Sequence, residues 1–161
     1  MRNKLERRFL KYTTIIFLSS LPFVLKKVKI KDSLLILFMN GYTNAIVDRF
    51  LVNRNILKYP VRFIPKDFKS NFVFNYLYLP IVSLWLYQLT KNDKPFKIII
   101  KIVSTVSSLF LFELWAEKNT KLIKWKKGWK WYYSLISLNV RTLFSRLIIE
   151  IINIIERKQK S

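Results

Sequence analysis

Apolar stretches of about twenty residues, roughly the length that crosses a bilayer, alternate along this sequence with short segments rich in lysine and arginine. The 161-residue chain is 52% hydrophobic and yet carries a formal net charge of +21. In a compact soluble protein so much like charge would repel itself. In a membrane protein lipid covers the apolar stretches and the basic loops face anionic headgroups. The pattern predicts an all-α fold, a polytopic integral membrane helical bundle with about five transmembrane helices, in a single domain covering 1–161.

The composition excludes most familiar active sites. The chain has only two glycines, which cannot form a phosphate-binding glycine-rich loop. It has no cysteine, and therefore no disulfide, thiol nucleophile or zinc knuckle. It also lacks histidine, the commonest general base and metal ligand. We therefore expect no metal, no cofactor and no catalytic residue, although intramembrane carboxylates leave a lipid-directed enzyme as an alternative.

Five segments are candidates for the spans. They cover residues 12–25, 33–52, 72–90, 96–116 and 131–155. Pro80 predicts a kink in the third segment, and the hydroxylated residues 104–108 of the fourth favour close approach of another helix. The sequence leaves open whether the first and last segments cross fully. The last has a continuous polar stripe, so it either spans or lies flat in the interface, and its apolar length favours spanning.

Polar side chains interrupt the second segment at a helical spacing. Asn40, Asn44 and Asp48 follow one another every four residues and share one helix face. Because such a face is costly in lipid, it should contact protein or water. Asp48 could pair with Arg141 or Arg146 across helices, which would mainly fix the bundle.

Other charges fall inside the fourth and fifth segments. Glu113 is either a proton or cation site or a carboxylate that reaches the interface or pairs with a lysine. Arg146 and Glu150 are four residues apart and can pair. With Arg141 they are the best candidates for a polar cavity, where arginine forks would hold an anionic headgroup or phosphate. The alternative is an interfacial helix with a solvated basic face.

Two segments combine basic residues with aromatic or apolar ones, at 53–71 and 117–133. Tryptophan, tyrosine and snorkelling lysine favour the headgroup level of a membrane. The expected headgroup contacts are Arg62, Lys66, Lys124, Trp125, Lys126, Lys127, Trp129 and Trp131. Aromatic rings could also stack on nucleic-acid bases, but apolar spans on both sides favour a membrane belt. The expected partners are therefore a bilayer with anionic headgroups and a membrane protein or second copy, not nucleic acid.

The basic residues also predict an orientation. With five spans, sixteen lysines and arginines lie in the N-terminal segment and the loops on its side, against ten on the other side. The positive-inside rule then places the N-terminus in the cytoplasm of a multi-pass cell-membrane protein.

Three stretches, at 30–50, 58–82 and 112–138, carry a family resemblance. They include the patterns Y-P-V-R-x-x-P and E-x-W-x-E-K-x-T-x-L-I. The chain resembles an uncharacterised family of small multi-pass membrane proteins of endospore-forming Gram-positive bacteria. The resemblance implies a membrane location and a link to sporulation or the cell envelope, and it assigns no functional residues.

Three functions are compatible with these observations. The favoured one is a structural or accessory cell-envelope protein that contacts anionic lipid or a membrane partner. The second is a small transporter or channel that uses Asp48, Glu113, Arg146 and Glu150. The third is the lipid-directed enzyme.

Overall fold

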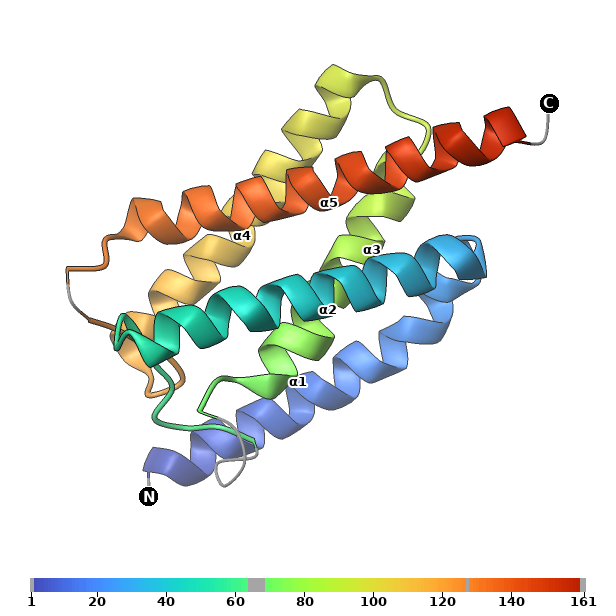
Figure 1. The fold of residues 1–161 in the computed structure, drawn as a ribbon. Helices are drawn as coiled ribbons and strands as arrows, with labels where there is room; N and C mark the ends of the chain where they lie inside the picture. Colours follow the sequence, from blue (N-terminus) through green and yellow to red (C-terminus); the bar gives the residue numbers. More distant parts are fainter. Residues whose placement is uncertain (1, 64–68, 127, 160–161) are drawn as a thin grey trace.

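The chain folds into a bundle of antiparallel helices, seen in a computed structural model that describes residues 2–63, 69–126 and 128–159. Successive helices run in opposite directions (Figure 1). The five α-helices in the described ranges are α1 (Arg2–Leu25), α2 (Ile30–Asn53), α3 (Leu79–Thr90), α4 (Pro95–Asn119) and α5 (Trp131–Gln159). The all-α prediction is therefore confirmed.

Helix α2 lies at the centre of the bundle. It packs against α3, against the turn before α3, and against α5. Helix α5 also packs along α4, and α1 packs on α3. One apolar cluster joins these elements through Val24, Ile36, Leu84 and Ile149. A second joins α3, α4 and α5 around Ile102. The last helix is thus packed lengthwise within the bundle.

Helix α1 begins about ten residues before the segment expected from hydropathy, a difference larger than the usual uncertainty of about two residues in a helix boundary. Its basic first turns are held by contacts with a distant loop. Leu10 packs with Val61 and Leu122, and Glu6 accepts a hydrogen bond of 2.6 Å from the backbone N–H of Lys121. Because these partners lie far away in the sequence, the hydropathy pattern could not reveal them.

The third expected span is interrupted near its start. A π-helical turn, η1 (Phe74–Tyr78), precedes α3. Pro80 lies in the first turn of α3, where its missing N–H is tolerated. The irregularity expected at Pro80 therefore lies one turn earlier, as a π-turn. There α2 comes very close, since a Cβ on Gly41 would lie 3.4 Å from Cδ1 of Tyr76.

Helix α4 meets its neighbours through large apolar side chains. Ile102, Val106 and Phe110 are buried, whereas Ser104 and Ser108 are exposed. The expectation that this hydroxylated region faces a neighbouring helix is wrong for these two serines. Burying the larger side chains removes more apolar area from water or lipid headgroups than burying the serines would.

Two short strands join the connections at one end of the bundle. Strand β1 (Leu57–Lys58) pairs antiparallel with β2 (Lys124–Trp125). Beside them the backbone N–H of Val61 donates to the carbonyl of Lys121 over 3.0 Å. Residues 57–61 are thus folded onto the second loop, a contact that the sequence did not predict. We call this end, which also holds the starts of α1 and α5, the strand end.

Two helices in the described ranges, Lys4–Leu25 and Pro95–Asn119, are long and apolar enough to cross a membrane by length and composition. The prediction of five spans is therefore not confirmed by this criterion. Helices α2 and α5 carry several charged and amide side chains, and the π-turn leaves α3 with 12 residues. The two candidate spans, α1 and α4, are largely exposed along their lengths, whereas the polar faces of α2 and α5 are turned inward.

A bulky side chain at Gly41 should separate α2 from η1. Gly41→Leu is expected to lower the free energy of unfolding by about 1–3 kcal/mol, because overpacking forces neighbours apart. Thermal unfolding in detergent measures this effect. Ala45→Leu, on a partly exposed turn of the same helix, serves as the control, and equal stability of the two variants would contradict the close approach.

Candidate functional site

The polar face of α2 is turned into the bundle. Asn40, Asn44 and Asp48 are 3%, 4% and 4% exposed, so the prediction that this face avoids lipid is confirmed. Asn40 donates to the hydroxyl of Ser145 on α5 over 2.7 Å. It also accepts a hydrogen bond of 3.2 Å from Ser83 on α3. One amide thus connects three helices.

Asp48 receives two hydrogen bonds from outside its own helix. The phenol of Tyr59 donates to Oδ1 over 2.5 Å, and Nδ2 of Asn75 in η1 donates to Oδ2 over 2.8 Å. Burial raises the pKa of the Tyr59 phenol well above its usual value, and the negative charge of Asp48 raises it further. The phenol therefore keeps its proton and remains a donor to Asp48.

Glu113 of α4 faces the same region. Its Oε1 accepts hydrogen bonds from the hydroxyl of Ser134 over 2.9 Å and from Nε1 of Trp125 over 3.2 Å. Nε1 of Trp129 in turn donates to Ser134 over 2.9 Å. No lysine pairs with Glu113 in the described ranges. Trp125 and Trp129 were expected at the headgroups, but their N–H groups point inward because the interior supplies acceptors.

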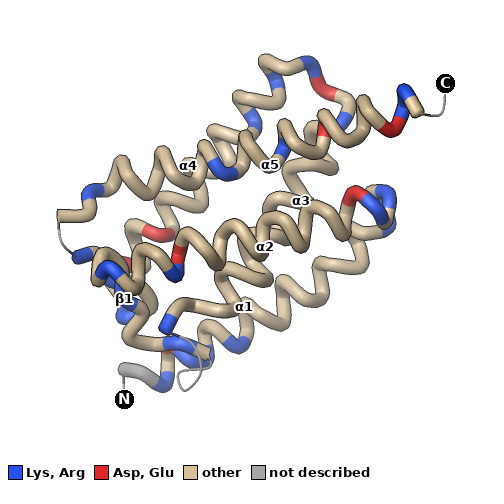
Figure 2. Tube along the Cα trace, in the orientation of Figure 1, with Lys and Arg blue, Asp and Glu red and all other residues tan. Residues whose placement is uncertain are grey.

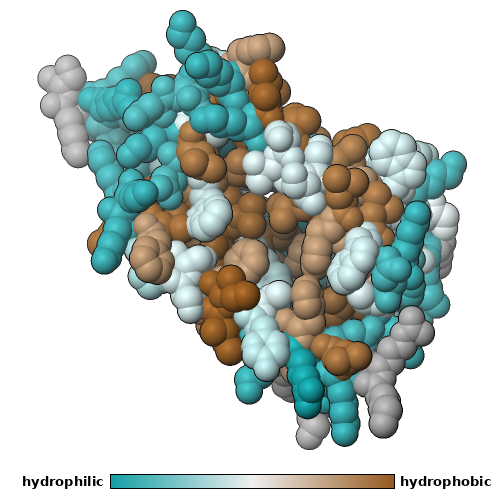
Figure 3. Space-filling model, turned by 180° about the vertical axis from the view of Figure 1, so that it is seen from behind, coloured by the Kyte–Doolittle hydropathy of each residue, from teal (hydrophilic) through white to brown (hydrophobic). Residues whose placement is uncertain are grey.

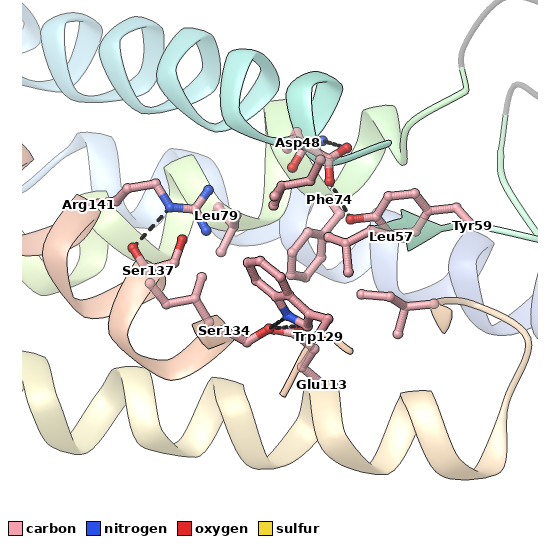
Figure 4. Close-up of a pocket in the computed structure, with 14 residues that line it drawn as sticks. Asp48, Leu57, Tyr59, Phe74, Leu79, Glu113, Trp129, Ser134, Ser137 and Arg141 are labelled. Atoms are coloured by element: carbon pink, nitrogen blue, oxygen red, sulfur yellow. Dashed lines mark hydrogen bonds between the residues drawn. The ribbon is translucent and has the colours of Figure 1, made fainter. Parts of the chain in front are cut away.

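Arg141 completes a small cavity between these carboxylates (Figure 4). The cavity is about 30 Å³ and is lined by Arg141, Asp48 and Glu113, among others. The guanidinium donates to the side chain of Asn44 over 3.0 Å and to the carbonyl of Ser137 over 3.1 Å. The expected Asp48–Arg141 ion pair is not formed, since among described residues no contact within 4.0 Å joins them. The space admits water but no larger solute.

We call Asp48, Tyr59, Asn75, Glu113, Ser134 and Arg141 together the Asp48 site. Its residues come from one loop and four helical segments and hold two carboxylates near one guanidinium. In the described ranges no three carboxylates lie together as metal ligands. The arrangement can fix helices, hold a water molecule or exchange a proton.

A second group, the Tyr87 group, lies nearer the opposite end of the bundle. Arg146 pairs with Glu150 at 2.7 Å, as the spacing predicted, and its guanidinium lies 5.0 Å above the ring of Tyr87. The phenol of Tyr87 donates to Asp32 over 3.0 Å and accepts from Asn153 over 3.1 Å. Asp48 and Arg146 therefore belong to different groups and do not pair.

These contacts form one interhelical polar network, which comprises the Asp48 site, the Tyr87 group and the Asn40 contacts between them. Sequence reasoning missed Asp32, Tyr59, Asn75 and Tyr87. Asp32 could have been predicted from the sequence, because it lies eight residues before Asn40 on the same face of α2. Tyr59 could not have been predicted, because no local sequence pattern links a loop tyrosine to a carboxylate on a helix.

The residues expected at headgroups have mixed environments. Lys126 and Trp131 are exposed at the strand end, as a headgroup role requires. Lys66 and Lys127 lie outside the described residues.

Two further candidates make contacts within the protein. The ammonium of Lys124 donates to the carbonyl of Glu117 and lies 3.8 Å from its carboxylate. Arg62 donates to the carbonyl of Lys69 over 2.9 Å. Both side chains thus brace the loops of the strand end.

Comparisons of the chain with family models, curated proteins and solved structures found no match.

Removing the phenol of Tyr59 should weaken the Asp48 site. Tyr59→Phe is expected to lower the free energy of unfolding by about 1–3 kcal/mol, because a buried carboxylate oxygen loses its donor. Tyr12→Phe is the matched control, since Tyr12 is 64% exposed and should change stability by at most about 0.5 kcal/mol. Thermal unfolding in detergent compares the two, and equal effects would contradict the role of Tyr59.

Proposed function

We propose that this chain is a multi-pass protein of the cell membrane with a structural or accessory role, whose strand end contacts anionic lipid. The observation that carries this proposal is the distribution of polarity. Amide and charged side chains lie between α2, α3 and α5, while large apolar side chains cover the outside. A protein in water usually keeps its charged groups on the outside and most of its large apolar side chains inside, whereas lipid favours the arrangement seen here.

The exposed apolar side chains form a band between two charged ends (Figures 2 and 3). Phe23 and Phe38 are each 72% exposed, and Leu111 and Phe144 are 64% and 61% exposed. These four residues come from α1, α2, α4 and α5. So extensive an exposed apolar surface is typical of contact with a membrane or another protein.

Five crossings are compatible with the helix lengths when η1 and α3, which follow one another from Phe74 to Thr90, cross as one segment. Helices α2 and α5 have 24 and 29 residues, or about 36 and 43 Å, against a hydrocarbon thickness of about 30 Å. Asp32, Asp48 and Arg146 would not meet lipid, because these side chains are buried in the bundle. The strand end holds the larger share of the loop lysines and arginines, which supports a cytoplasmic N-terminus.

A structural role agrees with the tight interior. Two cavities in the middle of the polar network measure about 30 and 10 Å³, and a larger hollow beside Asp32 lies at its end. Neither of the two cavities is large enough for a solute beyond water. Hydrogen bonds such as that between Asn40 and Ser145 hold different helices together, and in a membrane such bonds contribute about 0.6–2 kcal/mol each.

The resemblance to small membrane proteins of endospore-forming bacteria is a further argument for this proposal. It favours a role in the cell envelope, where a basic cytoplasmic face would attract anionic lipid. Exposed basic residues at the strand end include Lys118, Lys121, Lys126 and Lys130.

Cysteine labelling tests the crossings directly, because the native chain has no cysteine and gives no background. With the strand end cytoplasmic, a membrane-impermeant maleimide added to intact cells should label Lys27→Cys and Asn92→Cys. It should label Lys118→Cys and Lys126→Cys only after the membrane is permeabilised. All four positions are exposed.

Labelling of all four variants in intact cells would reject the alternating topology. Release of the wild-type chain from membranes by alkaline carbonate would reject integral insertion altogether.

A second candidate function, ion or proton transport, is favoured by one observation. A hollow of about 280 Å³ at the opposite end is lined by Asp32, Tyr87 and Glu150, among others, and leads to the polar network. Through this hollow, water or a cation would reach the buried carboxylates of the network.

Proteoliposomes separate the two functions. Under the structural proposal, wild type should show no more proton or cation flux than protein-free vesicles. Glu113→Gln should then leave this flux unchanged. A flux in wild type that Glu113→Gln abolishes, at equal protein level and thermal stability, would replace the structural role by transport.

A further inference from the structure

A groove runs along the outside of α2 near the strand end. Its volume is about 490 Å³. It is lined by one face of α2 and by the residues around the start of η1, namely Tyr42, Ala45, Ile46, Arg49, Val52, Asn53, Lys69, Ser70 and Tyr76.

The chemistry of the groove changes along its length. The α2 residues follow one another at helical spacing, so they form one stripe about 16 Å long from Tyr42 to Asn53. Toward the middle of the helix the stripe carries Ala45 and Ile46, and toward the strand end it carries Arg49. An apolar part thus lies toward the apolar band of the protein, and a cationic part lies at the charged end.

The cations of the groove are available to a ligand. Arg49 and Lys69 are exposed, and no carboxylate of the described residues lies within 4.0 Å of either. The groove adjoins a second hollow, of about 520 Å³, through Asn53 and Lys69, which adds Lys58 and Arg62 to the cationic part. Because the guanidinium of Arg62 donates to the carbonyl of Lys69, the loop that presents Lys69 is held in place.

We propose that this groove binds one anionic phospholipid molecule, with its phosphate at Arg49 and Lys69 and an acyl chain along Ala45 and Ile46. The inference rests on the proposed membrane function. A phospholipid in one leaflet has the same polarity gradient, because its phosphate lies at the headgroup level and its acyl chains extend toward the middle of the hydrocarbon core.

Two features favour a whole lipid over a free phosphate ion. A phosphate ion would use only the cationic part, whereas the groove continues as an apolar wall. Tyr42 and Tyr76 line the groove and are 68% and 45% exposed, and tyrosine favours the depth at which headgroup and acyl chain meet. Tyr76 packs against α2 at Gly41, so this wall is held by a contact between the two segments.

Native mass spectrometry of the full chain in mild detergent tests the site. The chain is titrated with phosphatidylglycerol and with phosphatidylcholine of the same acyl chains. Wild type should retain one phosphatidylglycerol molecule and bind phosphatidylcholine about tenfold more weakly. Arg49→Gln with Lys69→Gln should weaken phosphatidylglycerol binding about tenfold, because each cation near anionic lipid favours binding.

A matched control removes the same charge elsewhere. Lys94→Gln with Lys97→Gln changes two exposed lysines at the opposite end, where neither lines the groove, and it should bind as wild type does. Ala45→Trp keeps all charges but fills the apolar part, and it should also lose the bound lipid. If Ala45→Trp is not recovered folded, Ile46→Glu places a repelling carboxylate at the same wall.

The outcomes separate the groove from simpler explanations. Loss of binding in the arginine–lysine variant but not in Ala45→Trp or Ile46→Glu would indicate diffuse attraction and overturn the groove. Displacement of the lipid by glycerol 3-phosphate at equal concentration would assign the site to free phosphate and overturn the lipid. Unchanged binding in all variants would overturn the proposal. Each result leaves the cysteine-labelling pattern unaffected, so it is distinct from failure of the membrane topology.

Discussion

The hydrogen bonds that α2 makes through its polar face determine how the rest of the bundle is arranged. A helix that carries Asn40, Asn44 and Asp48 on one side must place that side against partners, because unpaired amides and carboxylates are costly away from water. The partners lie on α5 and on the segment from Asn75 to Ser83. Helix α2 is therefore central, and the more apolar α1 and α4 lie outside it.

The strand end shows how the loops depend on the same constraint. Asp48 lies in the next-to-last turn of α2, and its hydrogen-bond donors are Tyr59 and Asn75. Tyr59 is brought there by the pairing of β1 with β2. That pairing also turns Trp125 toward Glu113. The described parts of the two loops thus close one end of the bundle over buried charge.

The interior and the outer surface of the protein differ in polarity and in role. Inside, the network joins helices and leaves little space. Outside, an apolar band and a basic end match the depth profile of a membrane leaflet (Figures 2 and 3). The groove on α2 crosses this boundary, since its apolar and cationic parts lie on one helix face. The proposed structural role in a membrane, with an anionic lipid in the groove, is compatible with both surfaces.

The sequence by itself determined the features that depend on local spacing. The extents of α2 and α4, the inward face at Asn40, Asn44 and Asp48, and the Arg146–Glu150 pair followed from helical periodicity. Only the tertiary structure decided the early start of α1, the strand pair, the partners of Asp48 and the inward turn of Trp125 and Trp129. Each of these depends on contacts between segments far apart in the chain. Residue spacing reports which side chains share a helix face, but the identity of the opposite surface is set only when the helices pack.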